Sequence, residues 1–371
     1  MGGAEPIIYV SVVHSRSPIQ LAQSRRPAPH RWTGWLLAAA MLAPLAPAWA
    51  ADHAVAFIYH RFGETQYPST SIRLEQFEAH LQTLKAGGYR VLPLPEIVAA
   101  LASGQTLPDR TVAITIDDAY RSVFTEAWPR LRRAGMPFTV FVGTDAVDAK
   151  LPDYMSWDQL REMKAAGGVT FGNHTAAQRH LPGLDDATLD AEMTKAQGRI
   201  ASELGVTPTL LAYPSGEAGL RETKAARRLG FAAAFGQHSG VLHPAENRHL
   251  LPRFAMNEAY GDLERFRLAA DAMPLPVDEI TPPDPLLRQN PPAFGFTVDR
   301  TILGVERLAC FHSSFGQVKI ERLGTHRVEM RFPRPFPTGR SRLNCTMPVS
   351  RGEDGDTRWR WFGRQFYVPE R

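Results

Sequence analysis

The residues with the clearest chemical potential stand directly after short apolar runs. Asp117 and Asp118 follow the run 112–116, and His174 follows soon after the run 169–171. Two carboxylates at the end of a buried strand are costly unless a partner compensates their charge. A divalent metal would do so, because one carboxylate can bind the ion while the other acts as a base. Carboxylate and imidazole together suit Zn²⁺.

Other polar residues occupy similar positions. His60 ends the apolar run 55–59, and Tyr213 opens a Tyr-Pro-Ser-Gly turn after the run 210–212. Such a turn can direct the Tyr213 N–H toward a developing oxyanion. Gln178 and His180 lie shortly after His174. Each feature alone is typical of an ordinary turn or loop, so the prediction of a site depends on their occurrence together at successive strand ends.

The intervening sequence indicates how these residues are positioned. Apolar runs at 55–59, 112–116, 138–142, 169–171 and 210–213 alternate with amphipathic stretches, which predicts parallel strands separated by helices. One helix should begin with a capping box at Ser156, and a long one should cover 187–204 and end at Gly205. The pattern predicts an α/β barrel or an open sheet with its chemistry at the strand ends.

The predicted organisation has four parts. Residues 1–50 contain basic residues, a short apolar run and Ala48-Trp49-Ala50, which together predict a signal peptide cleaved after Ala50; a membrane-anchoring helix is the alternative. Residues 51–270 carry the α/β pattern. Residues 271–292 are expected to be an extended linker, because seven prolines fall between Pro274 and Pro292. Residues 293–371 read as a small all-β accessory domain.

Three segments resemble motifs of a known family. Thr115–Tyr120, Gly172–Thr175 and Ala212–Gly216 are similar to the first three motifs of the polysaccharide deacetylases, the NodB-homology group or carbohydrate esterase family 4. The resemblance covers about residues 55–266. It implies a distorted (β/α) barrel and metal-dependent hydrolysis of N-acetyl groups on an N-acetylated polysaccharide or cell-wall glycan.

The resemblance also implies residue roles. Asp117 would be the catalytic base, Asp118 and His174 metal ligands, and the Tyr213 N–H the oxyanion donor. His60 would be the general acid, as in exported poly-β-1,6-N-acetylglucosamine deacetylases. The family's arginine partner of the base is missing from the third motif, and Arg253 could replace it or be a surface charge.

One position departs from the family pattern. The second metal-binding histidine should stand four residues after His174, where this sequence has Gln178, a poorer Zn²⁺ ligand than imidazole. Three outcomes are open: a weaker metal site, a site completed by His180, or a catalytically impaired relative that binds glycans. A metal-dependent amidase acting on another C–N bond is a further alternative.

Composition limits the remaining choices. The chain has 371 residues, of which 44% are hydrophobic and 22% are charged, and these proportions exclude a wholly disordered or polytopic membrane protein. The net charge is +4, and residues 288–371 alone carry 15 basic and 8 acidic residues, or 15 − 8 = +7. No nucleic-acid motif accompanies this excess, so we expect no nucleic-acid partner, whereas peripheral membrane or envelope association is compatible with it.

The remaining expectations concern the exported protein. The signal predicts a periplasmic or secreted chain, in which Cys310 and Cys345 could pair. Trp359 and Trp361 could bind glycan or belong to the core of one strand. The sequence leaves the oligomeric state and the identity of the polymer open.

Overall fold

A parallel β-sheet carries the barrel-like part of the chain. The structure is a computed structural model, and it describes residues 50–349 and 358–369. The sheet has eight strands in the order β11-β10-β9-β8-β7-β2-β12, with β5 also paired to β7, and all its pairings are parallel. Its strands are β2 (Val55–Tyr59), β5 (Arg90–Val91), β7 (Thr111–Asp117), β8 (Phe138–Val142), β9 (Val169–Asn173), β10 (Leu210–Ala212), β11 (Ala233–Phe235) and β12 (Phe254–Ala255).

A short segment joins the two edges of this sheet. β12 pairs with β2, and just before β12 Leu251 forms a bridge to Phe235 of β11. The carbonyl of Leu251 also accepts a 2.8 Å hydrogen bond from the Gly236 N–H. The first and last strands of the order are thereby connected, and the sheet is the distorted (β/α) barrel that was predicted.

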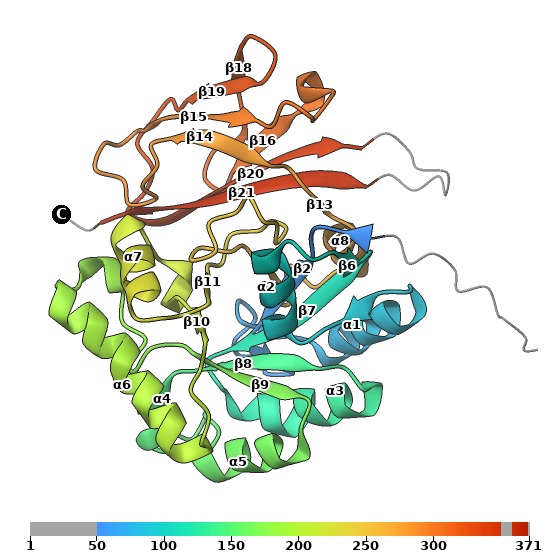
Figure 1. The fold of residues 1–371 in the computed structure, drawn as a ribbon, viewed down its shortest axis with the longest axis vertical. Helices are drawn as coiled ribbons and strands as arrows, with labels where there is room; N and C mark the ends of the chain where they lie inside the picture. Colours follow the sequence, from blue (N-terminus) through green and yellow to red (C-terminus); the bar gives the residue numbers. More distant parts are fainter. Residues whose placement is uncertain (1–49, 350–357, 370–371) are drawn as a thin grey trace, which may run out of the picture. The chain divides into compact units, whose positions relative to one another are not determined.

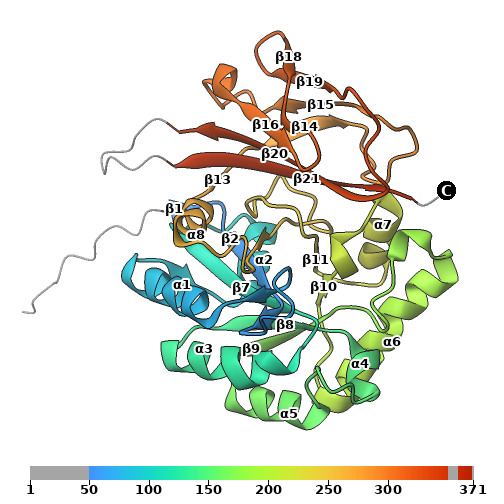
Figure 2. The same ribbon diagram turned by 180° about the vertical axis from the view of Figure 1, so that it is seen from behind.

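Helices pack around the strands (Figures 1 and 2). Ser156 and Gln159 form the predicted capping box of α5, and α6 ends at Gly205, which has the left-handed φ of 62° that favours glycine. The α-helices are α1 (Leu74–Ala86), α2 (Leu94–Ser103), α3 (Trp128–Ala134), α4 (Thr144–Asp148), α5 (Trp157–Ala166), α6 (Asp186–Leu204), α7 (Leu220–Arg228) and α8 (Leu263–Ala270). Shorter turns are a π-helix at Val123–Ala127 and 3₁₀ helices at Leu181–Gly183, Pro214–Gly216 and Val305–Arg307.

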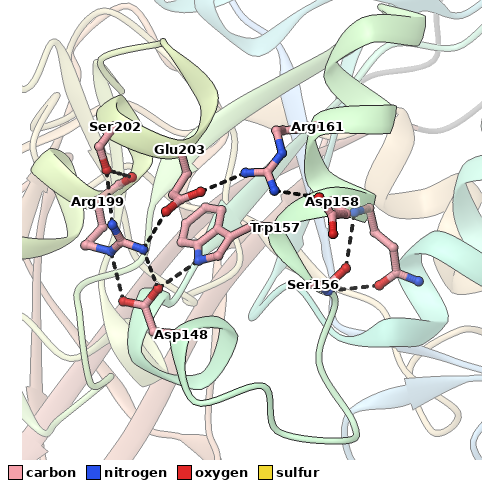
Figure 3. A network of polar contacts seen from close by, with 9 residues as sticks. Asp148, Ser156, Trp157, Asp158, Arg161, Arg199, Ser202 and Glu203 are labelled. Atoms are coloured by element: carbon pink, nitrogen blue, oxygen red, sulfur yellow. Dashed lines mark hydrogen bonds and ion pairs between the residues drawn. The ribbon is translucent and has the colours of Figure 1, made fainter.

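A polar network ties α4, α5 and α6 together (Figure 3). Arg199 donates two hydrogen bonds to Asp148, from Nε at 3.0 Å and from Nη2 at 2.7 Å. The indole N–H of Trp157 donates to the same carboxylate at 2.7 Å. Arg161 and Arg199 both donate to Glu203 at 2.7 Å. The network therefore connects three successive helices on the outside of the barrel.

The C-terminal region consists of two mixed or antiparallel sheets. One has the order β13-β21-β20-β16-β17 and the other β14-β15-β19-β18, and they enclose a core that includes Phe294, Phe296, Leu343 and Phe366. Their strands are β13 (Met273–Pro274), β14 (Val277–Thr281), β15 (Ala293–Val298), β16 (Ala309–His312), β17 (Gly316–Val318), β18 (Ile320–Leu323), β19 (Arg327–Arg331), β20 (Gly339–Pro348) and β21 (Trp359–Val368). Two small pairs complete the fold, β1 (Ala50–Ala51) with β6 (Leu107–Pro108) and β3 (Arg61–Phe62) with β4 (Ser71–Ile72).

The proline-rich segment differs from the expected extended linker. β13 pairs with β21 and β14 pairs with β15, so this segment supplies strands to both C-terminal sheets. Both are edge strands, the position in a sheet where the missing N–H of proline is tolerated. Cys310 and Cys345 are register partners on β16 and β20 and form a disulfide.

The predicted signal peptide, residues 1–50, lies outside the described residues except for Ala50. Within 50–349 and 358–369, no helix combines the length and the apolar character that a membrane crossing requires.

Candidate active site

The carboxyl ends of the parallel strands bring the predicted residues to one edge of the barrel. Asp117 is the last residue of β7, His174 follows β9, and His60 follows β2. A cavity of about 420 Å³ opens there. Its lining residues are His60, Ser69, Thr70, Asp118, His174, Gln178, Pro214, Ser215, Gln237, Ala255, Met256, Asn257, Tyr260, Arg340 and Arg342.

Backbone strain is concentrated at this edge. Asp118, Thr175, Gln178 and Ser215 all have positive φ, with values of 75°, 63°, 54° and 58°. This conformation is uncommon for residues other than glycine and is rare for a β-branched residue such as threonine. Strained residues of this kind persist where the surrounding structure holds them, and they cluster at functional sites.

Asp117 is fully buried and forms a two-point ion pair with Arg253. Arg253 Nη1 donates to Asp117 Oδ1 at 2.7 Å, and Nη2 donates to Oδ2 at 2.8 Å. Its Nε donates to the Gly236 carbonyl at 3.0 Å, and Nη1 also reaches Thr115 Oγ1 at 3.1 Å. Both side chains have an exposed fraction of 0%. Arg253 is therefore not a surface charge; it contacts Asp117 directly.

The pair determines the charge state of Asp117. Burial raises the pKa of this carboxyl, but the charge and hydrogen bonds of Arg253, together with His174 and His60, more than offset burial, and the pKa lies below its ordinary value. Asp117 is therefore an ionised carboxylate at neutral pH, as a general base must be.

His174 is oriented by the strand that follows it. Its Nδ1 donates a 2.8 Å hydrogen bond to the carbonyl of Ala212, so Nε2 is directed to the carboxylates. Nε2 lies 3.2 Å from Asp118 Oδ1 and 3.9 Å from Asp117 Oδ2. Burial lowers the pKa of His174, but the two carboxylates raise it above its ordinary value. The arrangement favours a positive charge, a proton or a metal ion, between His174 and Asp118.

The structure places Gln178 in the site and His180 outside it. The amide of Gln178 donates a hydrogen bond to Asp118 Oδ1. A Cβ at Gly143 would lie 2.6 Å from Gln178 Cδ, so the glycine provides the space that this side chain occupies. The side chain of His180 is 71% exposed, and Nδ1 forms a 2.7 Å hydrogen bond with Glu217 Oε2. His180 does not line the cavity.

These residues allow a test of whether the site suits a divalent metal. Within the described ranges, no cluster of three His, Cys, Asp or Glu side chains is arranged to hold an ion. Asp118 and His174 nevertheless offer one carboxylate and one correctly oriented imidazole, and Gln178 adds a neutral amide oxygen if its side chain turns over. The donor set therefore fits a divalent cation with two strong protein ligands and one weak ligand.

The two remaining predicted residues have different positions. His60 lines the cavity, and burial lowers its pKa although Asp118 and Asp117 partly oppose that effect.

The Tyr213 N–H is not directed at the cavity, because it donates to the Phe235 carbonyl at 3.0 Å and extends the β10–β11 ladder. The assignment of Tyr213 as oxyanion donor is therefore not supported by this geometry.

Ser215 is a site residue that the sequence did not single out. It lines the cavity, and within 50–349 and 358–369 no acceptor takes a hydrogen bond from its backbone N–H. Its positive φ breaks the 3₁₀ turn Pro214–Gly216 at this residue. The Pro-Ser-Gly sequence after an apolar run indicates a turn in which one backbone N–H has no acceptor. The sequence does not tell which residue carries that N–H.

Trp361 has a structural position in the described fold. Its ring packs edge-on against Phe254 of the barrel, with a centroid distance of 5.0 Å, and its indole N–H donates to Asn344 Oδ1 at 3.2 Å. Trp361 therefore contributes to the contact between β21 and the barrel.

Comparisons with known proteins agree with the geometry. The model of the family described as polysaccharide deacetylase matches residues 104–234. The Bacillus subtilis protein YxkH is 26% identical over 185 residues, which are 50% of this chain and 65% of YxkH. The poly-β-1,6-N-acetyl-D-glucosamine N-deacetylase of Staphylococcus aureus is 24% identical over 213 residues, covering 54% of this chain and 73% of that enzyme.

Solved structures show the same fold. The Streptococcus pyogenes deacetylase PplD aligns with a TM-score of 0.55 at 21% identity, covering 59% of this chain and 98% of PplD. IcaB from Ammonifex degensii aligns with a TM-score of 0.52 at 25% identity, covering 59% of this chain and 97% of IcaB. Residues 104–234 thus match the polysaccharide deacetylase family model, and the solved deacetylase structures share the fold of the barrel.

Proposed function

We propose that this protein is a hydrolase that removes N-acetyl groups from an N-acetylhexosamine polysaccharide and releases acetate. One observation carries the proposal: a buried aspartate, held ionised by Arg253, stands beside an Asp118–His174 pair at the opening of a cavity. This combination supplies a base next to a site for a cation, as amide hydrolysis requires. The named relatives support the same activity.

The residues of the chain have distinct parts in this reaction. Asp117 takes the proton of the attacking water, because it is the carboxylate that Arg253 keeps ionised. Asp118 and His174 would hold a divalent cation, for which we propose Zn²⁺, and such an ion polarises a carbonyl and lowers the pKa of water. We propose that the Ser215 N–H, for which the described residues provide no acceptor, donates to the oxyanion, a contact that typically contributes about 3 kcal/mol. His60 would give a proton to the leaving amine from its imidazolium form, which the nearby Asp118 and Asp117 favour against the effect of burial.

A second candidate is a glycan-binding protein with little or no catalysis. The hydrogen bond between the Gln178 amide and Asp118 favours it, because that bond occupies a carboxylate oxygen that a metal would need. The ionised Asp117 favours the enzyme, since binding alone does not need a buried base.

Export is also proposed. The predicted signal and the disulfide between Cys310 and Cys345 both support a periplasmic or secreted protein, because disulfides persist in oxidising compartments.

Acetate release tests the proposed function. The protein is incubated with β-1,6- and β-1,4-linked N-acetylglucosamine oligomers in chelator, and Zn²⁺ or Co²⁺ is then added. We expect release that depends on added metal, and the preferred linkage then identifies the polymer. No release with any metal, together with glycan binding that persists in chelator, would favour the second candidate.

A further inference from the structure

One face of the C-terminal sheet points at the barrel. Along β20, alternate residues enter the C-terminal core, so the residues between them lie on the opposite face. The core-facing residues include Leu343, Cys345 and Met347, and the opposite row begins with Arg340 and Arg342. In both views β20 and β21 run between the barrel and the strands β14, β15, β18 and β19 (Figures 1 and 2).

This face is held against the loop that carries Ser215. Gln365 of β21 donates from Nε2 to the carbonyls of Ser215 and Gly216, at 3.2 Å and 2.9 Å. Arg340 donates from Nη1 to the Ser215 carbonyl at 3.1 Å. Two residues before Gln365, a Cβ at Gly363 would lie only 1.8 Å from the Ser239 carbonyl oxygen. The backbones of Gly363 and Ser239 are therefore in close contact. The sheet is therefore fixed beside the candidate active site.

Arg342 adds positive charge to the lining of the cavity. Arg342 lines the cavity and is half-buried. The side-chain hydrogen bond that it forms runs from Nε to Gln365 Oε1 at 3.3 Å, and in the described part of the chain no acidic side chain lies within ion-pair distance. Burial and the neighbouring Arg340 both lower the pKa of Arg342. Among the described residues, no partner occupies its two Nη groups, which can therefore bind a ligand in the cavity.

Arg340 is only weakly neutralised. Its Nε lies 3.5 Å from Glu217 Oε1, and Glu217 is also engaged by His180 at 2.7 Å. Asp118 is the carboxylate among the cavity-lining residues, and it already contacts His174 and Gln178. The part of the cavity lined by β20 is therefore positively charged.

We propose that Arg340 and Arg342 form an anion-binding subsite that selects a polysaccharide carrying negatively charged groups next to its N-acetylated sugars. This inference rests on the proposed function for the identity of the polymer as a glycan. An unsubstituted N-acetylhexosamine is neutral, so the charge would come from a uronic acid carboxylate on a neighbouring unit or from a sulfate ester on the same or a neighbouring unit. Guanidinium groups bind both through paired N–H donors.

Binding of defined hexasaccharides tests the subsite. Titration calorimetry compares three ligands: a hyaluronan hexasaccharide with carboxylates, a keratan sulfate hexasaccharide with sulfates, and neutral chitohexaose. Measurements in chelator prevent metal-dependent turnover, and mass spectrometry of the recovered ligand confirms that it is intact. The variants are Arg342→Gln, Arg340→Gln and, as the matched control, Arg300→Gln, which removes an exposed arginine outside the cavity lining.

We expect at least one acidic hexasaccharide to bind about tenfold more tightly than chitohexaose, the ratio that one charge-assisted contact gives. Arg342→Gln should remove this preference, Arg340→Gln should weaken it, and Arg300→Gln should leave it within about twofold. A further variant, Arg342→Lys, should retain part of the preference. The ligand that wins identifies the anion as carboxylate or sulfate.

Equal affinity for acidic and neutral ligands would contradict the proposed subsite. An equal loss of affinity for the acidic ligand in Arg342→Gln and Arg300→Gln would also contradict it. Absence of acidic-ligand binding would also overturn it. These outcomes differ from failure of the proposed function, which is the absence of metal-dependent acetate release from every oligomer.

Discussion

Asp117 can serve as a base only while its carboxylate stays ionised inside the protein, and Arg253 is the group that keeps it so. Arg253 lies 136 residues later in the chain, on the segment that closes the barrel. A pair of this kind is expensive to break, because removing one partner leaves a buried charge uncompensated.

A mutant cycle measures this dependence. Arg253→Met should lower the free energy of unfolding by about 3–5 kcal/mol, because Asp117 is left buried and unpaired. Adding Asp117→Asn to that variant should recover part of the loss, because no carboxylate then remains to be neutralised. Urea unfolding followed by circular dichroism gives the four free energies. Additive losses would contradict direct coupling.

Two substitutions distinguish the contributions of Gln178 and His180 to metal binding. Gln178→His should raise Zn²⁺ affinity by at least about tenfold, because imidazole is a better ligand for zinc than an amide. His180→Ala should leave the affinity unchanged, because the exposed His180 is bonded to Glu217. Competition with a zinc chelator measures both affinities. A loss of affinity in His180→Ala would show that His180 moves into the site.

The sequence predicted the site residues to different degrees. Asp117, Asp118, His174 and His60 were predicted from their places after apolar runs, and the structure brings them together. The choice between Gln178 and His180 depended on loop geometry, including the space beside Gly143, which spacing in the chain does not contain.

At the scale of elements, the network joining α4, α5 and α6 should stabilise the outside of the barrel (Figure 3). Arg199 contacts both Asp148 and Glu203. Because these groups are partly exposed, each ion pair contributes little by itself, and the network should contribute more.

Arg199→Ala should therefore lower the free energy of unfolding by about 1–2 kcal/mol. The control is Arg228→Ala, which removes one exposed pair with Asp190 and should cost clearly less than Arg199→Ala. Denaturant unfolding at low and high salt gives both values. Equal effects of the two substitutions would mean that the network adds nothing beyond isolated pairs.

Elements with strong local signals were predictable, and edge strands were not. The capping box at Ser156 and the glycine after α6 mark helix ends through contacts within a few residues. The strands in the proline-rich segment depend on partners far along the chain, β21 and β15, so composition alone suggested a linker. Arg340 and Arg342 reach the cavity for the same reason, through tertiary contacts of β20.

At the scale of the whole molecule, buried histidines should make stability depend on pH. Burial lowers the pKa of His80 to about 4, of His238 to about 3 and of His312 to about 4. His80 is held neutral between Tyr59 and Gly261: its Nδ1 lies 3.0 Å from the Tyr59 hydroxyl, and its Nε2 lies 2.9 Å from the Gly261 carbonyl.

The direction of the effect follows from proton uptake. Between about pH 6.5 and 4 the unfolded chain binds protons at these histidines and the folded chain does not, so stability falls as the pH falls. Each histidine contributes at most about 1.4 kcal/mol per pH unit in this window. Urea unfolding at pH 7.5 and 5 should show the loss, and His80→Gln should reduce it. Unchanged stability at pH 5 would contradict neutral buried histidines.

The proposed role of Asp117 as the base of a deacetylase predicts that its substitution slows acetate release. Acetate release from N-acetylglucosamine oligomers is measured for the wild-type protein and for Asp117→Asn, with metal content determined by mass spectrometry in both. We predict at least about 100-fold slower release by the variant at equal metal content. Equal rates of release by the two proteins would show that Asp117 is not the base.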